Sequence, residues 1–113
     1  MSVYVKVLIP AKSVEAIDTI QYTAPTGVHA IIDKFTCTNY DTVARSIIVN
    51  LVTVGGTATN TNKIVSSRTL QPNETYTFPE LVGSAIAPGG FISTLASQAA
   101  ALNIRASGRE ITQ

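Results

Sequence analysis

Two stretches decide how this chain folds: Ala30-Ile31-Ile32-Asp33-Lys34-Phe35-Thr36-Cys37-Thr38 and Ser46-Ile47-Ile48-Val49-Asn50-Leu51-Val52-Thr53-Val54. Both mix β-branched and other apolar residues with Thr, Ser and Asn, a composition that favours β-strands over helices. In the first stretch, a strand would alternate its side chains between two faces. We expect one face to carry Ile31, Asp33, Phe35 and Cys37, and the other to carry Ala30, Ile32, Lys34 and Thr36.

The second stretch is apolar on both faces. Ile47, Val49 and Leu51 would lie on one side, opposite Ile48, Asn50 and Val52. A strand of this kind is either central in its sheet or carries an interface on its outer side.

Similar runs recur along the chain, separated by turn signals such as Pro25-Thr26-Gly27 and Pro88-Gly89-Gly90. Turn signals every 8 to 12 residues are typical of an all-β sandwich. We therefore predict an antiparallel, jelly-roll-like β-sandwich of about eight strands. The expected strands are 3–9, 18–24, 28–40, 45–54, 63–70, 74–78, 91–96 and 101–106.

We expect residues 1–15 to form an N-terminal strand or arm, and residues 16–113 to form a single sandwich domain. Pro10 should end the first strand, and Ser107-Gly108 should interrupt the last one before 110–112 continues it. The polar stretch 55–62 should be a flexible hairpin loop that projects from the domain.

The composition points away from several function classes. Only 13% of the 113 residues are charged, the net charge is +1, and no basic cluster stands out, so we expect no nucleic-acid partner. No run approaches the ~20 apolar residues of a membrane span, so we expect no membrane partner. The hydrophobic content of 45% is high for a small domain, which favours an apolar surface covered by a partner.

The residues that most catalysis requires are scarce. His29 is the only imidazole and Cys37 the only thiol, and they lie eight positions apart on one expected strand. An extended chain separates them by about 26 Å, so they cannot act as a pair within one subunit. We expect His29 on the surface and Cys37 as a small buried side chain, as in a protein folded in a reducing compartment.

Acidic and glycine-rich segments give no site either. The seven acids form no recognisable pair, and Asp33 should lie near the sheet rim or bind a Lys or Arg. Asn39-Tyr40-Asp41 has too few oxygen ligands for calcium, and Gly55-Gly56 is not followed by the Lys of a phosphate loop. We therefore predict no enzyme activity, no catalytic residue, no metal site and no cofactor.

The order of the turns and strands resembles that of small β-sandwich virion proteins of tailed bacteriophages, over roughly residues 20–111. The turn Pro88-Gly89-Gly90 departs from the pattern because it lacks the acid that often follows there. The matching segments are Thr23-Ala24-Pro25-Thr26-Gly27, Phe35-Thr36-Cys37-Thr38-Asn39, Leu70-Gln71-Pro72-Asn73-Glu74-Thr75-Tyr76 and Ser107-Gly108-Arg109-Glu110-Ile111.

This resemblance implies a structural virion protein, assembled in the bacterial host cytoplasm and located in the virus particle. Our first expectation is a capsid decoration (cement) protein that binds the major capsid protein and forms a homo-oligomer, with an N-terminal arm able to add a strand to a neighbour. The expected partner contacts are Val3, Tyr4, Val5, Val7, Ile9, Ile48, Val52, Thr57, Thr59 and Asn60.

Two alternatives remain open. The first is a ring component of the neck or tail, which would use the same kind of sandwich with neck or tail proteins as partners. The second belongs to another class, an adhesin or carbohydrate-binding module. That function needs exposed aromatic residues on one face, for which Tyr22, Tyr40 and Tyr76 are the candidates.

Overall fold

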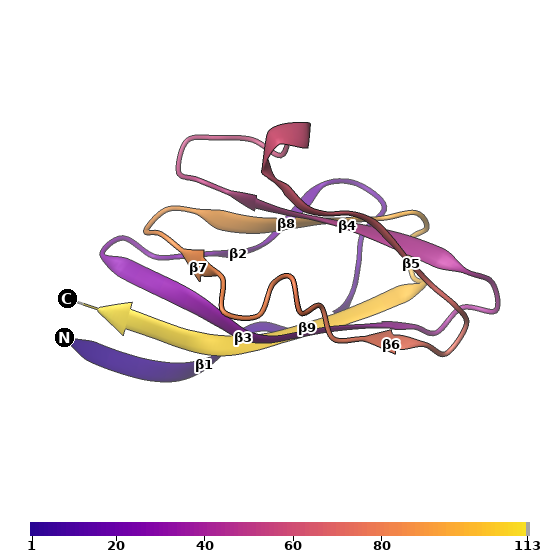
Figure 1. Ribbon diagram of the computed structural model, residues 1–113, viewed down its shortest axis with the longest axis horizontal. Helices are drawn as coiled ribbons and strands as arrows, with labels where there is room; N and C mark the ends of the chain where they lie inside the picture. Colours follow the sequence, from indigo (N-terminus) through magenta and orange to yellow (C-terminus); the bar gives the residue numbers. More distant parts are fainter. Residues whose placement is uncertain (113) are drawn as a thin grey trace.

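The computed structural model describes residues 1–112, and this part of the chain forms two antiparallel sheets packed face to face (Figure 1). The single 3₁₀ turn in it is η1 (Asn60–Asn62). The prediction of an all-β sandwich is confirmed. The strands are β1 (Ser2–Ser13), β2 (Thr19–Thr23), β3 (Val28–Asn39), β4 (Arg45–Val52), β5 (Lys63–Leu70), β6 (Thr75–Tyr76), β7 (Ala85–Ile86), β8 (Phe91–Ala96) and β9 (Leu102–Thr112).

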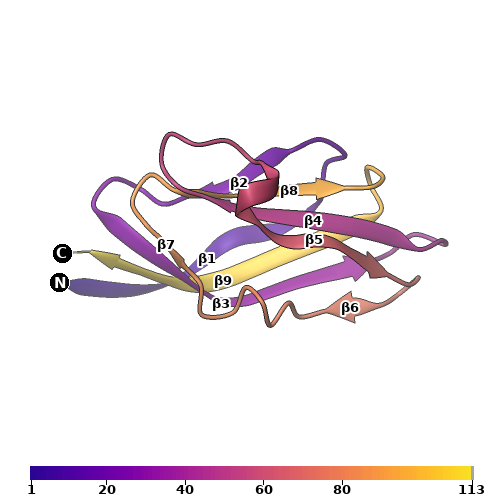
Figure 2. The same ribbon diagram turned by 45° about the horizontal axis from the view of Figure 1, so that its top comes forward.

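The strand order is that of a jelly roll. One sheet runs β1-β9-β3-β6, with β7 also paired to β3, and the other runs β2-β8-β4-β5. We call them sheet A and sheet B. The short strands β6 and β7 share one position beside β3, so the chain fills eight positions in two four-stranded layers, as a jelly roll does. Figure 2 shows the two layers with the chain crossing between them at both ends.

The core lies between the two layers. Phe35 of β3 and Phe78 of the segment after β6 are fully buried, and their rings meet edge to face with centroids 5.0 Å apart. Ile47 and Val49 of β4 are also fully buried, and β4 lies between β8 and β5, so of the two alternatives left open for this strand the central position is the one observed.

The expected faces of β3 are wrong at one end. Ala30 and Ile32 point into the core, as do Phe35 and Cys37. Both sets are buried because the pairing register with β9 shifts between Ile32 and Lys34. A β-bulge of this kind adds one residue and reverses the side to which the following side chains point.

The strand end predicted at Pro10 and the strand interruption predicted at Gly108 are also wrong. β1 continues past Pro10 to Ser13, with register shifts between Val7 and Ile9 and between Ile9 and Lys12. β1 is an edge strand, where the missing N–H of proline is tolerated. Leu8 and Ile9 of this strand belong to the core, and β1 pairs with β9 of the same chain.

Gly108 does not interrupt β9, because the close approach of two strands requires glycine there. Gly108 pairs with Lys6 on one side and Ile32 on the other. A Cβ atom at position 108 would lie 2.0 Å from the backbone oxygen of Ile31, which is far inside any real contact. The residue that looked like a strand breaker is therefore a packing requirement of the central strand.

We predict that Gly108→Ala destabilises the domain by about 3 kcal/mol or more, since backbone atoms of β3 must move to accept the methyl group. Chemical denaturation monitored by circular dichroism measures this change. The neighbouring substitution Ser107→Ala, at a half-buried position, is the control and should change the free energy of unfolding by less than about 1 kcal/mol. Equal effects of the two substitutions would contradict the close-approach argument.

Candidate interaction surface

The apolar residues predicted for the start of β1 lie on both sides of sheet A. Tyr4 pairs with Glu110, and the Glu110 side chain points inward, where it accepts a hydrogen bond from Tyr22 of sheet B. Directly opposed residues share a face, so Tyr4 lies on the inward side of the sheet. Val3, Val5 and Val7 consequently lie on its outer side.

These valines join other apolar residues on the outer side of sheet A. In the register, Val3 faces Ile111, while Val5 faces Arg109, which in turn faces Ile31. We call Val3, Val5, Val7, Ile31 and Ile111 the valine face. Val5 is the most exposed of them, at 90%.

One charged pair lies within the valine face. Arg109 donates two hydrogen bonds of 2.9 Å from Nε and Nη2 to the two carboxylate oxygens of Asp33. This confirms that Asp33 binds an Arg. The bidentate pair fixes the guanidinium group and balances its charge, so the face carries little net charge at that point.

On the inner side of β1, a small polar cluster joins the two sheets. The buried carboxylate of Glu110 accepts hydrogen bonds from the Tyr22 hydroxyl of β2 and from Lys6 Nζ of β1, the latter at 3.3 Å. Burial raises the pKa of Tyr22, and the bond to Glu110 raises it further. The cluster therefore keeps Tyr22 neutral as a donor and fixes β1 to sheet B.

Two of the predicted contact residues are not on the surface. Ile9 is 1% exposed in the core, and Val52 is 4% exposed. Val52 lies outside the main core cluster, close to Gly56, where a Cβ atom would be 3.1 Å from Val52 Cγ1. The loop after β4 therefore covers Val52, while Ile48, four residues earlier in β4, stays half-buried.

That loop carries Thr57, Thr59 and Asn60, which are exposed, but it does not extend freely from the domain. Asn62 Oδ1 accepts hydrogen bonds from Asn50 Nδ2 at 2.6 Å and from the backbone N–H of Thr59 at 3.0 Å. Asn62 Nδ2 donates to the carbonyl oxygen of Thr57 at 2.8 Å. The predicted projecting loop is thus folded back over β4, held by one asparagine.

The three tyrosines proposed for carbohydrate binding do not form one surface. Tyr22 is half-buried between the sheets, and Tyr76 is half-buried in sheet A with its ring against Phe78 and Arg68. Tyr40 is exposed in the turn after β3 and hydrogen-bonds Ser13. They come from different elements, so an aromatic platform is not assembled from them.

Residues with catalytic potential are also dispersed. His29 is exposed and Cys37 buried on the same strand, β3, as expected. Within residues 1–112, no three His, Cys, Asp or Glu side chains gather as a metal site would require. No helix in this part of the chain has the length and apolarity needed to cross a membrane.

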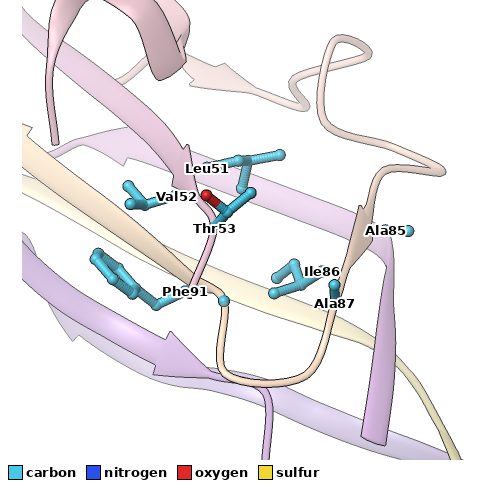
Figure 3. Close-up of a pocket in the computed structure, with 8 residues that line it drawn as sticks. Leu51, Val52, Thr53, Ala85, Ile86, Ala87 and Phe91 are labelled. Carbon is cyan, nitrogen blue, oxygen red and sulfur yellow. The ribbon is translucent and has the colours of Figure 1, made fainter. Parts of the chain in front are cut away.

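Two pockets in the described part of the chain are small. One, of about 150 Å³, opens between the end of β4 and β7, with Leu51, Val52 and Phe91 on one side and Ile86 and Ala87 on the other (Figure 3). The other, of about 180 Å³, lies beside Asn50 under the folded-back loop. Sites for small molecules usually measure ~300 Å³ or more, so neither pocket matches a ligand site in size.

Comparisons with known proteins give a distant structural likeness. No model of a known protein family matches the chain. No curated protein matches it either. A chain in the structure of the infectious bursal disease virus Gx strain is similar, with 14% sequence identity and a TM-score of 0.44 over 96% of this chain. A chain from the Gt strain is similar with 12% identity and a TM-score of 0.35, again over 96% of this chain.

This chain spans 32% and 30% of the two virus chains, about a third of their length. Neither structure is that of a tailed bacteriophage. A likeness at these values carries no argument about function.

The sequence prediction included Val3, Val5 and Val7 but not Ile31 and Ile111, which complete the valine face. A strand broken at Ser107-Gly108 separates Ile111 from the rest of the sheet, and simple alternation puts Ile31 on the same face as Phe35 and Cys37. The alternation Ser107-Gly108-Arg109-Glu110-Ile111 contains the missing signal, provided that Gly108 is interpreted as a strand residue. The bulge near Asp33 has no comparable signal, because it depends on the partner strand.

We predict that Asn62→Ala releases the loop over β4 and lowers the free energy of unfolding by about 1 to 2 kcal/mol, because it removes three hydrogen bonds. Amide hydrogen exchange should become faster in residues 53–62 alone. Asn60→Ala is the matched control, since Asn60 is the same residue type, exposed, two positions earlier. A loop that exchanges at the same rate in both variants would contradict the role given to Asn62.

We also predict alkaline sensitivity from the buried thiol. Burial raises the pKa of Cys37 from 9.0 to about 12. A raised pKa means that the unfolded chain loses this proton first, so stability is full below pH 9 and is lost as the pH rises towards 12. Between pH 9 and 11 the thiol should remove about 2 to 3 kcal/mol from the free energy of unfolding.

Denaturation curves across this pH range measure the loss, and Cys37→Ala is the comparison. The variant starts less stable by about 1 kcal/mol because of the missing sulfur, but its stability should fall less steeply above pH 9. The same slope in both proteins would rule out Cys37 as the source.

Proposed function

We propose that this chain is a structural protein of a virus particle, which acts by covering or joining neighbouring protein subunits. The observation that carries the proposal is the valine face, an exposed apolar surface on a rigid sheet. Val3 and Val5 of this face are at least half exposed, as is Tyr4 on the other side of the strand. A group of apolar residues exposed together on one face of a protein often marks a protein–protein contact site.

The fold supports the same function. A jelly roll closes two sheets around one core without a cofactor, and it is a common domain of viral capsids. Among residues 1–112, the groups that could do chemistry are dispersed, and the pockets are small.

Within this function, we favour a decoration protein that binds the major capsid protein of a tailed bacteriophage. The chain is compact, and its N-terminal residues belong to its own sheet. Ring components of the neck or tail more often carry long arms or helices. The neck or tail position is the alternative, and copy number separates the two.

The test is the number of copies of this chain in purified virus particles, measured by quantitative mass spectrometry against the major shell protein. The particles are those of a virus whose genome encodes this chain, purified from an infected culture. We expect a number on the scale of the whole shell. A number on the scale of one ring would move the protein to the neck or tail, and absence from the particles would overturn the virion function.

The substitution Val5→Asp provides the residue-level test in the same particles. It places a charge on the β1 edge of the valine face, at a position that is 90% exposed, so the domain should remain folded. We expect its copy number per particle to fall at least tenfold. Gln98→Asp, in the exposed turn between β8 and β9, is the matched control and should leave the copy number unchanged.

A further inference from the structure

The four sheet edges of this sandwich differ in how they are protected against pairing with another strand. An edge strand exposes unpaired N–H and C=O groups, and proteins block such edges with short strands, bulges, proline or charge. The edges in residues 1–112 are β1 and the β6–β7 pair in sheet A, and β2 and β5 in sheet B.

Three of these edges are protected. β6 and β7 are two residues each, and β2 is five residues long with a register shift between Ile20 and Tyr22. β5 carries charged Arg68 and a shift where Ser67 has a φ of 116°, which distorts the edge. None of the three offers a long regular ladder.

The first half of β1 has no such protection. Residues Ser2–Val7 pair with Thr112–Ser107 in an unbroken register, and the first shift comes only after Val7. Pro10 lies beyond that shift. β1 has a neighbouring strand on one side only, and its other side is free in Figure 1. Lys6 is the single charge on this segment, and Glu110 already binds it.

We propose that a second copy of this chain pairs antiparallel with the free edge of β1, about a two-fold axis at Val5. Such an axis stands perpendicular to the sheet and brings identical surfaces together, so one patch serves both copies. The pairing extends sheet A across the two copies. It goes beyond the virion function and does not depend on it.

The side chains select this register. With Val5 opposite Val5 of the second copy, Val3 of each copy lies opposite Val7 of the other on the outer side. On the inner side, Tyr4 lies opposite Lys6, where an aromatic ring and an ammonium group attract each other. A register centred on Lys6 would instead oppose two like charges, which is unfavourable. Centred on Tyr4, the pairing would leave Val7 without an opposite valine.

The exposures agree with a contact of this kind. Val5 is 90% exposed and Tyr4 is 57% exposed, although the same strand contributes Leu8 and Ile9 to the core. Pairing would cover these side chains and unite the two valine faces into one apolar strip. The second copy therefore explains why a regular strand presents apolar groups on both of its sides.

The experiment measures the mass of the full chain by sedimentation over a wide range of protein concentrations. We expect a concentration-dependent dimer. Val5→Lys should weaken the dimer at least tenfold, because two like charges would oppose each other at the axis. An equal mixture of Val5→Lys and Val5→Glu should restore it. Ile20→Lys, at a 55% exposed apolar position on the β2 edge, is the matched control and should leave the dimer intact.

Cross-linking tests the register. Opposed residues of an antiparallel pair have Cβ atoms about 4.5 to 5.5 Å apart, close to the distance that a disulfide requires. Val5→Cys should form a covalent dimer on mild oxidation. Val3→Cys alone should not, but it should cross-link to Val7→Cys when the two variants are mixed. The buried Cys37 takes no part.

Thermal unfolding of each variant shows whether it is folded, so a monomer can be told from an unfolded chain. A wild-type protein that stays monomeric at every concentration would overturn the proposal. So would a dimer that survives Val5→Lys or is lost with Ile20→Lys. These results concern the isolated chain, so they are separate from the copy number that tests the virion function.

Discussion

Sheet A depends on β9, which has a long strand on each side. β9 pairs with β1 along one side and with β3 along the other, so its backbone fixes the register of all three strands. This arrangement is possible only because residue 108 has no side chain to separate β9 from Ile31. The same register directs Glu110 into the domain and Ile111 out of it. The inner polar cluster and the valine face are therefore two results of one pairing.

Polar groups in the interior hold the layers and loops in place. All buried side-chain polar atoms of the described residues have hydrogen-bond partners. Asn39 Nδ2 donates to the carbonyl oxygens of Val43 at 3.0 Å and Leu70 at 2.9 Å, and its Oδ1 accepts from the N–H of Asp41. Asn50 has the same function under the folded-back loop. A buried amide without hydrogen bonds is costly. Each of these asparagines therefore favours the one arrangement of the neighbouring chain that satisfies its hydrogen bonds.

Local pattern was sufficient for the strands and the fold class, because apolar alternation and turn residues act over a few positions. It correctly identified Cys37 as buried, and of the two alternatives it left open for β4, a central strand or an outer interface, the central position is observed. It failed at Pro10, at the bulge between Ile32 and Lys34, and at Gly108, where the outcome depends on which strand lies alongside. The Glu110 cluster was missed for the same reason, since its partners Tyr22 and Lys6 are 88 and 104 positions away. Of the predicted contact residues, Ile9 and Val52 are buried because a bulge and a covering loop altered their surroundings.

The position of β9 in the sequence has a consequence for how the protein folds. β1 and β3 are made long before β9, yet each needs it as a neighbour, so sheet A cannot close until residues 102–112 are available. Pairing between distant segments makes β-sandwiches slow to fold. During that interval two long strands have unpaired edges, the state in which chains associate with one another incorrectly. The rate at which the last strand inserts, as well as the stability of the finished sandwich, therefore governs how much of the protein escapes aggregation.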